Sequence, residues 1–283
     1  MIKSMKNLVY YDLKYIFSKR NIILLYLIIS TIVIVNISYR IPPLISNNLD
    51  LYGYIFMNSN LTMYIPFIIS IYLSSLIFFD NDLDSFLKIR IVNKRHWLLS
   101  KVLTICIINL IIITIITIIT LLIGGMFLGI HTNWSDSTIS IANNIPMTVT
   151  DFKYTIFYSP VKLILINSSI YILFMTFISL ISNIISLSLK TPKLSIILPV
   201  IYIIVSFFLN MAPNAKLTKF FNSQSYIILG TRNYYNFGSL GEMYLTFKQA
   251  FFIPLISLII LIFISVIIIR KFDFCIGEKR LWH

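Results

Sequence analysis

Few residues in this chain have the types and spacing that catalysis requires. Only two glutamates occur, Glu242 and Glu278, and the three histidines lie far apart at His96, His131 and His283. No H-E-x-x-H pair is present, so a zinc protease is not indicated. No G-x-x-x-x-G-K-[ST] segment occurs either, so the chain does not bind ATP through a phosphate-binding loop.

One pair could supply a nucleophile and its base, namely Cys106 and His96. Such a pair is typical of a cysteine peptidase. Ten residues of helix span about 15 Å, which is far beyond hydrogen-bond reach. We therefore interpret Cys106 as a small apolar residue within a membrane helix. With Cys275 as the only other cysteine, a disulfide framework is excluded.

The composition indicates an integral membrane protein. Of the 283 residues, 58% are hydrophobic and only 12% are charged. Soluble domains carry about 25% charged residues, so this chain has too few charges to cover a water-exposed surface. We find no segment long and polar enough to form a separate soluble domain and predict a single membrane domain over residues 1–283.

Six uncharged stretches are long enough, or nearly so, to cross a bilayer as helices. They cover residues 21–38, 61–79, 102–130, 163–189, 194–211 and 249–269. A helix needs about 20 apolar residues to do so. The alternating pattern of a β-barrel is missing. The predicted fold is therefore all-α, with six transmembrane helices.

Most lysines and arginines fall on one side of this predicted arrangement. They concentrate before the first span, in loops 80–101 and 190–193, and after the last span. The positive-inside rule then puts both termini in the cytosol of a multi-pass plasma membrane protein. The net charge of +13 reflects this rule and contact with anionic lipid, and we predict no nucleic-acid partner.

An amphipathic helix is predicted within residues 1–20. Its apolar positions recur at helical spacing and include Leu8, Leu13, Ile16 and Phe17. Lysines flank this face, which favours a helix lying in the cytosolic membrane interface. The alternative is a basic tail without fixed structure.

The loop at 80–101 is the most distinctive segment, with acidic residues first and basic residues last. Asp82, Asp84 and Ser85 suit a helix N-terminus. Apolar residues follow at Phe86, Leu87, Ile89 and Ile91. A short helix of this kind must bury them against a partner protein or the membrane interface. We expect a turn at residues 93–95, after which His96 opens the next long helix.

Two further features have open interpretations. Residues 212–248 are rich in aromatic side chains, which indicates either re-entrant or interfacial helices or an ordinary aromatic belt. Mild polar residues lie within the spans at Asn109, Thr117, Asn167, Thr176 and Asn183. They serve helix packing or line a transport pathway. No charge lies within the spans, which argues against an ion-coupled transporter and favours energy from another subunit.

The whole pattern resembles the membrane subunit of an ABC-2 type exporter. That family has six spans, cytosolic termini, an amphipathic elbow helix, a coupling helix between spans two and three, and an aromatic hairpin before span six. Here Asp82 or Asp84, Ser85, Phe86-Leu87, Arg95 and Lys101 match the positions of the family's coupling loop. Aspartate replaces the usual glutamate, serine the usual glycine, and Asn93 stands where proline or glycine is common.

The resemblance implies a permease that dimerises with a second copy or a paralogue. A separate cytosolic ATPase, which holds ATP and Mg²⁺, would dock on the coupling helix at 84–92, including Ile89, Arg90 and Ile91. Arg95 would anchor to lipid phosphate or to the elbow helix. This chain itself would hold no cofactor. Ile-, Lys- and Asn-rich permeases of this size resemble peptide exporters and antimicrobial-immunity pumps of Gram-positive bacteria, so amphipathic peptides or other hydrophobic compounds are the expected substrates.

Two other classes remain open. An intramembrane peptidase or lipid-modifying enzyme would need a polar constellation within one or two spans, which we do not find. A membrane scaffold or sensor would usually carry a soluble output domain, and the sequence has none.

Overall fold

The computed structural model describes residues 2–18, 29, 46–58, 60–79, 94–144, 154–210, 220–221, 223–227, 232–233 and 245–270. These residues are almost entirely helical, which confirms the all-α prediction. Apart from residue 29, the predicted first span lies outside the described residues. The predicted coupling helix at 84–92 also lies outside them.

Three helices are long and apolar enough to cross a membrane: α6 (Lys94–Leu128), α9 (Pro160–Ser188) and α14 (Phe247–Arg270). They indicate a membrane-associated protein. The helices α4 (Asn60–Phe79) and α10 (Leu194–Asn210) add shorter apolar stretches, Pro66–Phe79 and Leu194–Ser206. The described part of the chain thus accounts for three of the six predicted spans by length and composition.

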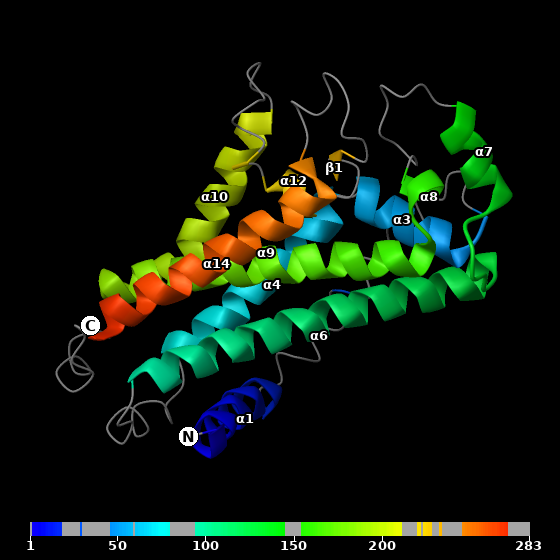
Figure 1. Ribbon diagram of the computed structural model, residues 1–283. Coiled ribbons are helices and arrows are strands. Elements are labelled where there is room, and N and C mark those ends of the chain that lie inside the picture. Colours follow the sequence, from blue (N-terminus) through cyan, green and yellow to red (C-terminus); the bar gives the residue numbers. More distant parts are fainter. Residues whose placement is uncertain are drawn as a thin grey trace.

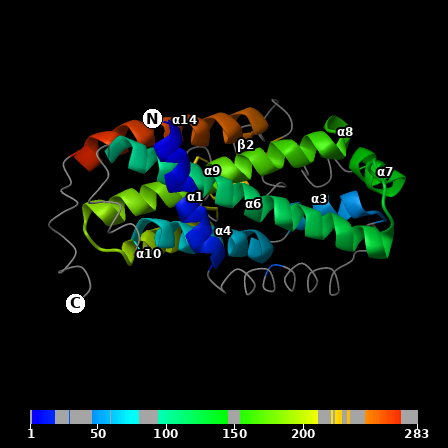
Figure 2. The same ribbon diagram turned by 90° about the horizontal axis from the view of Figure 1, so that it is seen from below.

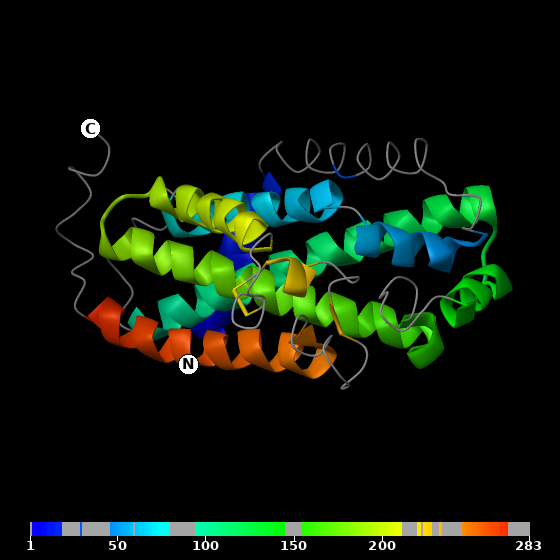
Figure 3. The same ribbon diagram turned by 90° about the horizontal axis from the view of Figure 1, so that it is seen from above.

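The helix α9 occupies the centre of the bundle. It packs against α4, α6, α10 and α14, and Figure 3 shows it running between α10 and α14. Side chains on several faces of α9 are buried, among them Asn167, Tyr171, Phe174 and Asn183. The helix α14, in contrast, keeps much of its apolar surface exposed, including Phe263 and Ile267. Such a surface suits contact with lipid or with another apolar helix.

The helix α1 (Ile2–Ser18) crosses the bundle instead of running along it. Seen from below, α1 lies across α6 and α4 near the end where α6 begins (Figure 2). It packs mainly on α6 and also contacts α4. Residues 2–18 therefore form the predicted helix, and part of its apolar face is covered by protein.

At the other end, the helix α3 (Asn48–Asn58) packs along α6. We did not predict this helix from the sequence. The Asn47 side chain caps it by accepting hydrogen bonds from the backbone amides of Leu49 and Asp50, at 3.0 and 2.8 Å. Gly124 permits the close contact, because a Cβ atom there would lie 2.9 Å from Asn48 Cα. Gly124, near the end of the third predicted span, therefore serves helix packing.

The segment after α6 folds over this end of the bundle. It contains α7 (Asp136–Asn144) and leads to α8 (Tyr154–Phe157), as Figure 1 shows. The Asn48 side chain accepts a hydrogen bond from the His131 amide at 3.0 Å. The indole of Trp134 donates to the Tyr158 carbonyl at 2.8 Å. These bonds tie the segment after α6 to the first residue of α3 and to the chain just before α9.

A tight turn joins α9 to α10. Lys190 adopts a φ of 55°, and the Thr191 amide donates to the Ser186 carbonyl at 3.0 Å. The Lys190 amide donates to the Leu187 carbonyl at 3.2 Å. This is the Schellman arrangement, whose left-handed position is usually glycine. The turn makes α9 and α10 antiparallel neighbours.

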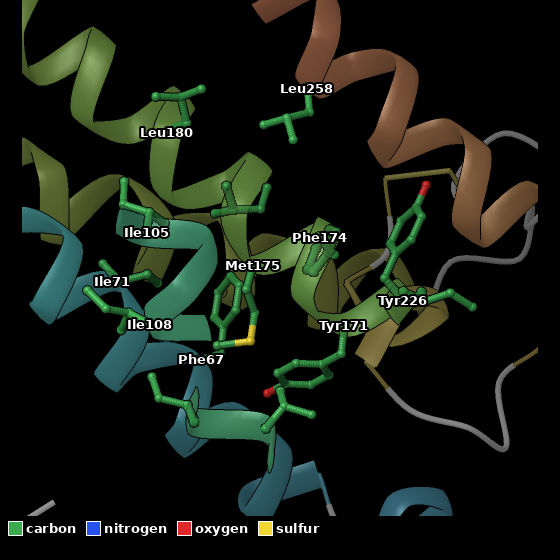
Figure 4. Close-up of a cluster of buried hydrophobic side chains, with 14 of the residues drawn as sticks. Phe67, Ile71, Ile105, Ile108, Tyr171, Phe174, Met175, Leu180, Tyr226 and Leu258 are labelled. Carbon is green, nitrogen blue, oxygen red and sulfur yellow. The ribbon is translucent and has the colours of Figure 1, made fainter. Parts of the chain in front are cut away.

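Part of the aromatic segment 212–248 packs onto the middle of α9. It contributes the short helix α12 (Gln224–Ile227) and a two-residue parallel pairing of β1 (Arg232–Asn233) with β2 (Leu245–Thr246). The Tyr226 ring stacks on Phe174 with centroids 4.7 Å apart and planes at 7° (Figure 4). Tyr226 is buried, so this part of the segment is not a solvated loop. Most of the segment lies outside the described residues.

Candidate functional site

A buried ion pair joins α1 to the beginning of α6. The Lys101 Nζ atom lies 2.9 Å from Asp12 Oδ1, and the two side chains are only 1% and 4% exposed. Thr104 Oγ1 makes a longer contact of 3.4 Å with the other carboxylate oxygen of Asp12. A buried charge is costly unless it is paired and hydrogen-bonded, and this pair meets both conditions.

Aromatic side chains close this junction from the bundle side. The Lys101 ammonium lies 5.6 Å from the centroid of the Trp97 ring, one helical turn earlier in α6. Trp97 packs edge-on against Phe78 of α4, with centroids 5.6 Å apart. Trp97 and Phe78 are each 1% exposed. The first turns of α6, the end of α4 and the middle of α1 therefore form one packed unit.

Of the predicted coupling residues, Arg95 and Lys101 belong to the described helix α6. The expected turn at 93–95 is wrong for Lys94 and Arg95, which are already helical. Arg95 is exposed, whereas Lys101 is buried. The remaining coupling residues, which lie outside the described part, are Asp82, Asp84, Ser85, Phe86, Leu87, Ile89, Arg90 and Ile91.

Lys101 makes a contact to α1. The anchoring of Arg95 to lipid phosphate or to the elbow helix stays a prediction. On α1 itself, Ile16 is buried, Leu8 and Leu13 are half-buried, and Phe17 is 52% exposed. Sequence reasoning missed Asp12. A signal was present, because Asp12 lies one turn from both Leu8 and Ile16 and so interrupts the apolar face with a charge.

A polar network joins α4, α6 and α9 in the middle of the bundle. Ser70 Oγ donates to Asn109 Oδ1, and Asn109 Nδ2 donates to Thr176 Oγ1 at 3.0 Å. Cys106, which is half-buried, lies beside Thr176. Each of the hydroxyl and amide residues is at most 1% exposed. Hydrogen bonds of this kind hold helices together where no water is available.

The other predicted polar residues lie above and below this network. Asn167 donates to the Tyr52 hydroxyl of α3 at 3.2 Å, and Asn183 donates to Ser74 of α4 at 3.2 Å. Thr117 is 9% exposed, and its hydroxyl has no hydrogen-bond partner among the described residues. Four of the five predicted residues, all except Thr117, therefore connect helices of the same chain. Their part in a transport pathway stays a prediction.

The described residues bring no metal-binding cluster together. No cluster of three or more histidine, cysteine, aspartate or glutamate side chains occurs among them. His96 lies in the first turn of α6, and Cys106 is part of the polar network farther along the same helix.

No protein-family model matches this chain, and no curated protein matches it.

Proposed function

We propose that this chain is the membrane-spanning permease subunit of an ATP-driven ABC exporter. The observation that carries the proposal is the buried Asp12–Lys101 pair. It fixes a crosswise amphipathic helix to the start of the long helix that follows loop 80–93. An elbow helix coupled to the segment after a docking loop is the arrangement that the ABC-2 resemblance implies.

The junction suits the transfer of a mechanical displacement. Residues 80–93 lead directly into α6, and Lys101 lies in the second turn of that helix. A partner that moved the loop would move the first turns of α6, and the ion pair and Trp97 would carry α1 and α4 with them. Packed units of this kind move as rigid bodies because protein interiors do not deform continuously.

The charges of the described residues support the proposed orientation. Lys94 and Arg95 begin α6, and Lys190 and Lys193 flank the turn before α10. These elements meet at one end of the bundle, at the left of Figure 1. The positive-inside rule makes that end cytosolic in a multi-pass plasma membrane protein, with α1 on the ATPase side.

The proposed substrates are amphipathic peptides or other hydrophobic compounds. The exposed surfaces of the long helices are apolar, and the predicted pathway residues are uncharged amides and hydroxyls. ATP and Mg²⁺ would be held by the partner ATPase, and a second permease copy or a paralogue would complete the dimer.

The test is a pull-down of the tagged chain from its native membrane in mild detergent, followed by intact-mass analysis. We expect a stoichiometric ATPase that is lost when Phe86 and Leu87 are both replaced by aspartate. Replacing Met126 and Phe127 by aspartate, an exposed apolar pair at the other end of α6, is the matched control and should leave the ATPase bound. A preparation without any ATPase would contradict the proposal and favour the intramembrane enzyme.

A further inference from the structure

An apolar cavity lies between α9, α10, α12 and α14. Its volume is about 430 Å³. Phe174 and Ile181 of α9, Pro199 and Tyr202 of α10, Tyr226 of α12 and Pro254 of α14 contribute to its walls. Ligand sites in proteins have volumes of about 300–1,000 Å³, so this cavity has the size of a binding site. It is separate from the Asp12–Lys101 junction and from the polar network.

Three of the four polar side chains on the cavity wall donate hydrogen bonds within the protein. The Tyr202 hydroxyl donates to the Phe221 carbonyl at 2.9 Å, and the Tyr226 hydroxyl donates to the Phe220 carbonyl at 3.0 Å. Ser182 Oγ donates to the Ile178 carbonyl at 2.9 Å. No charged residue lines the cavity. A charged ligand would find no counter-ion there and few available hydrogen-bond donors, whereas a hydrocarbon group needs neither.

Two prolines line the cavity. Pro199 lies inside α10 and Pro254 lies inside α14, and both line the cavity from opposite sides of α9. A proline within a helix removes one backbone hydrogen bond and crowds the preceding turn, which disfavours a straight helix.

The cavity is only partly enclosed and is continuous with apolar outer surfaces. Three of its lining residues, Ile185, Phe220 and Phe221, are exposed. The outer faces of α10 and α14 beside it carry exposed isoleucines, including Ile201 and Ile256. For a helix in a bilayer, the medium in contact with such surfaces is lipid hydrocarbon. The cavity thus opens toward acyl chains and not toward water.

We propose that this cavity binds an acyl chain of a bilayer lipid. An empty apolar cavity forfeits the dispersion contacts of its lining atoms. A cavity of about 150 Å³ lined by aliphatic and aromatic residues already binds benzene. The present cavity is larger, apolar and open toward hydrocarbon. This inference depends on insertion into a membrane but not on transport, so it can hold or fail independently of the exporter proposal.

The experiment uses the full chain in phosphatidylcholine nanodiscs that contain a small fraction of phosphatidylcholine with a diazirine in its acyl chain. After photolysis, labelled residues are mapped by peptide mass spectrometry. We expect label on Ile178, which lines the cavity but is only 6% exposed and so cannot be reached by lipid around the protein. Filling the cavity with Ile181→Trp should lower that label at least fivefold. The control Ile201→Trp adds the same ring to an exposed position outside the cavity and should leave the label unchanged.

Two results would overturn the proposal. In the wild-type chain, label confined to exposed residues would mean that the cavity excludes lipid. Persistence of the Ile178 label in a folded Ile181→Trp variant would mean that the label entered by another route. If Ile181→Trp does not fold, Ser257→Phe fills the cavity from the α14 wall. The Ile178 label in Ser257→Phe is then compared with that in the wild-type chain, and an unchanged label overturns the proposal.

Discussion

The carboxylate of Asp12 lies 2.9 Å from the ammonium of Lys101, although the two residues are 89 positions apart in the chain. This pair attaches the crosswise helix α1 to the membrane helix α6. Both side chains are almost completely shielded from solvent. Helix α1 is thereby a fixed part of the bundle and not only a surface element on lipid.

Removing one partner of this pair should destabilise the protein strongly. Asp12→Asn or Lys101→Met leaves an uncompensated buried charge, which costs about 3–5 kcal/mol. The double variant Asp12→Leu with Lys101→Met leaves no charge and should recover most of the loss. The measurement is the free energy of unfolding in mixed detergent. Lys14→Met, on an exposed position of α1, is the control, and equal effects of Lys14→Met and Lys101→Met would contradict the assignment.

The hydrogen bond between Asn109 and Thr176 should couple α6 to α9. In a double-mutant cycle with Asn109→Ala and Thr176→Val, we expect a coupling free energy of about 1 kcal/mol, as for hydrogen bonds between other membrane helices. Thr114→Val on an exposed position of α6 serves as the unpaired control and should show no coupling to Thr176. Strictly additive effects would show that the network contributes no interhelical stability. If either variant lost transport while its free energy of unfolding stayed unchanged, that result would instead support a place for Asn109 and Thr176 in a transport pathway.

The two ends of the bundle should lie on opposite sides of the membrane. In a variant without native cysteines, a membrane-impermeant maleimide should label Asn133→Cys in intact cells. Lys193→Cys should be labelled only after the membrane is permeabilised. Both positions are exposed, so differences in labelling report the side of the membrane and not burial. Labelling of both in intact cells would contradict the proposed orientation.

The turn between α9 and α10 offers a stabilising substitution. Lys190 has a φ of 55°, and the left-handed conformation costs a residue with a Cβ atom about 1–2 kcal/mol. Lys190→Gly should relieve this strain and raise the free energy of unfolding. The expected gain is at most about 1 kcal/mol, because the greater freedom of glycine in the unfolded chain offsets part of it. Lys193→Gly removes the same charge without relieving strain, so it should stabilise nothing. The thermal unfolding midpoint in detergent checks both.

The sequence alone determined the chemical class of the protein and the positions of its long helices. The apolar runs at 102–130, 163–189 and 249–269 match α6, α9 and α14 closely, because run length and the absence of charge are local properties. The helix at the N-terminus was equally predictable, since its apolar spacing is contained in 17 residues. The helix α3 was missed because it is short and begins with polar caps.

Only the tertiary structure decided which side chains meet. Asp12 and Lys101 each interrupt an apolar helical face. A charge on such a face needs an oppositely charged partner if it is buried, but the sequence does not show which residue that partner is. Their pairing depends on the crossing of α1 over α6, which is set by packing between segments far apart in the chain. The same holds for Asn109 with Thr176 and for Tyr226 with Phe174. The sequence specifies helices through local hydrophobicity, whereas contacts between helices arise from the shapes of whole faces that are assembled only in the fold.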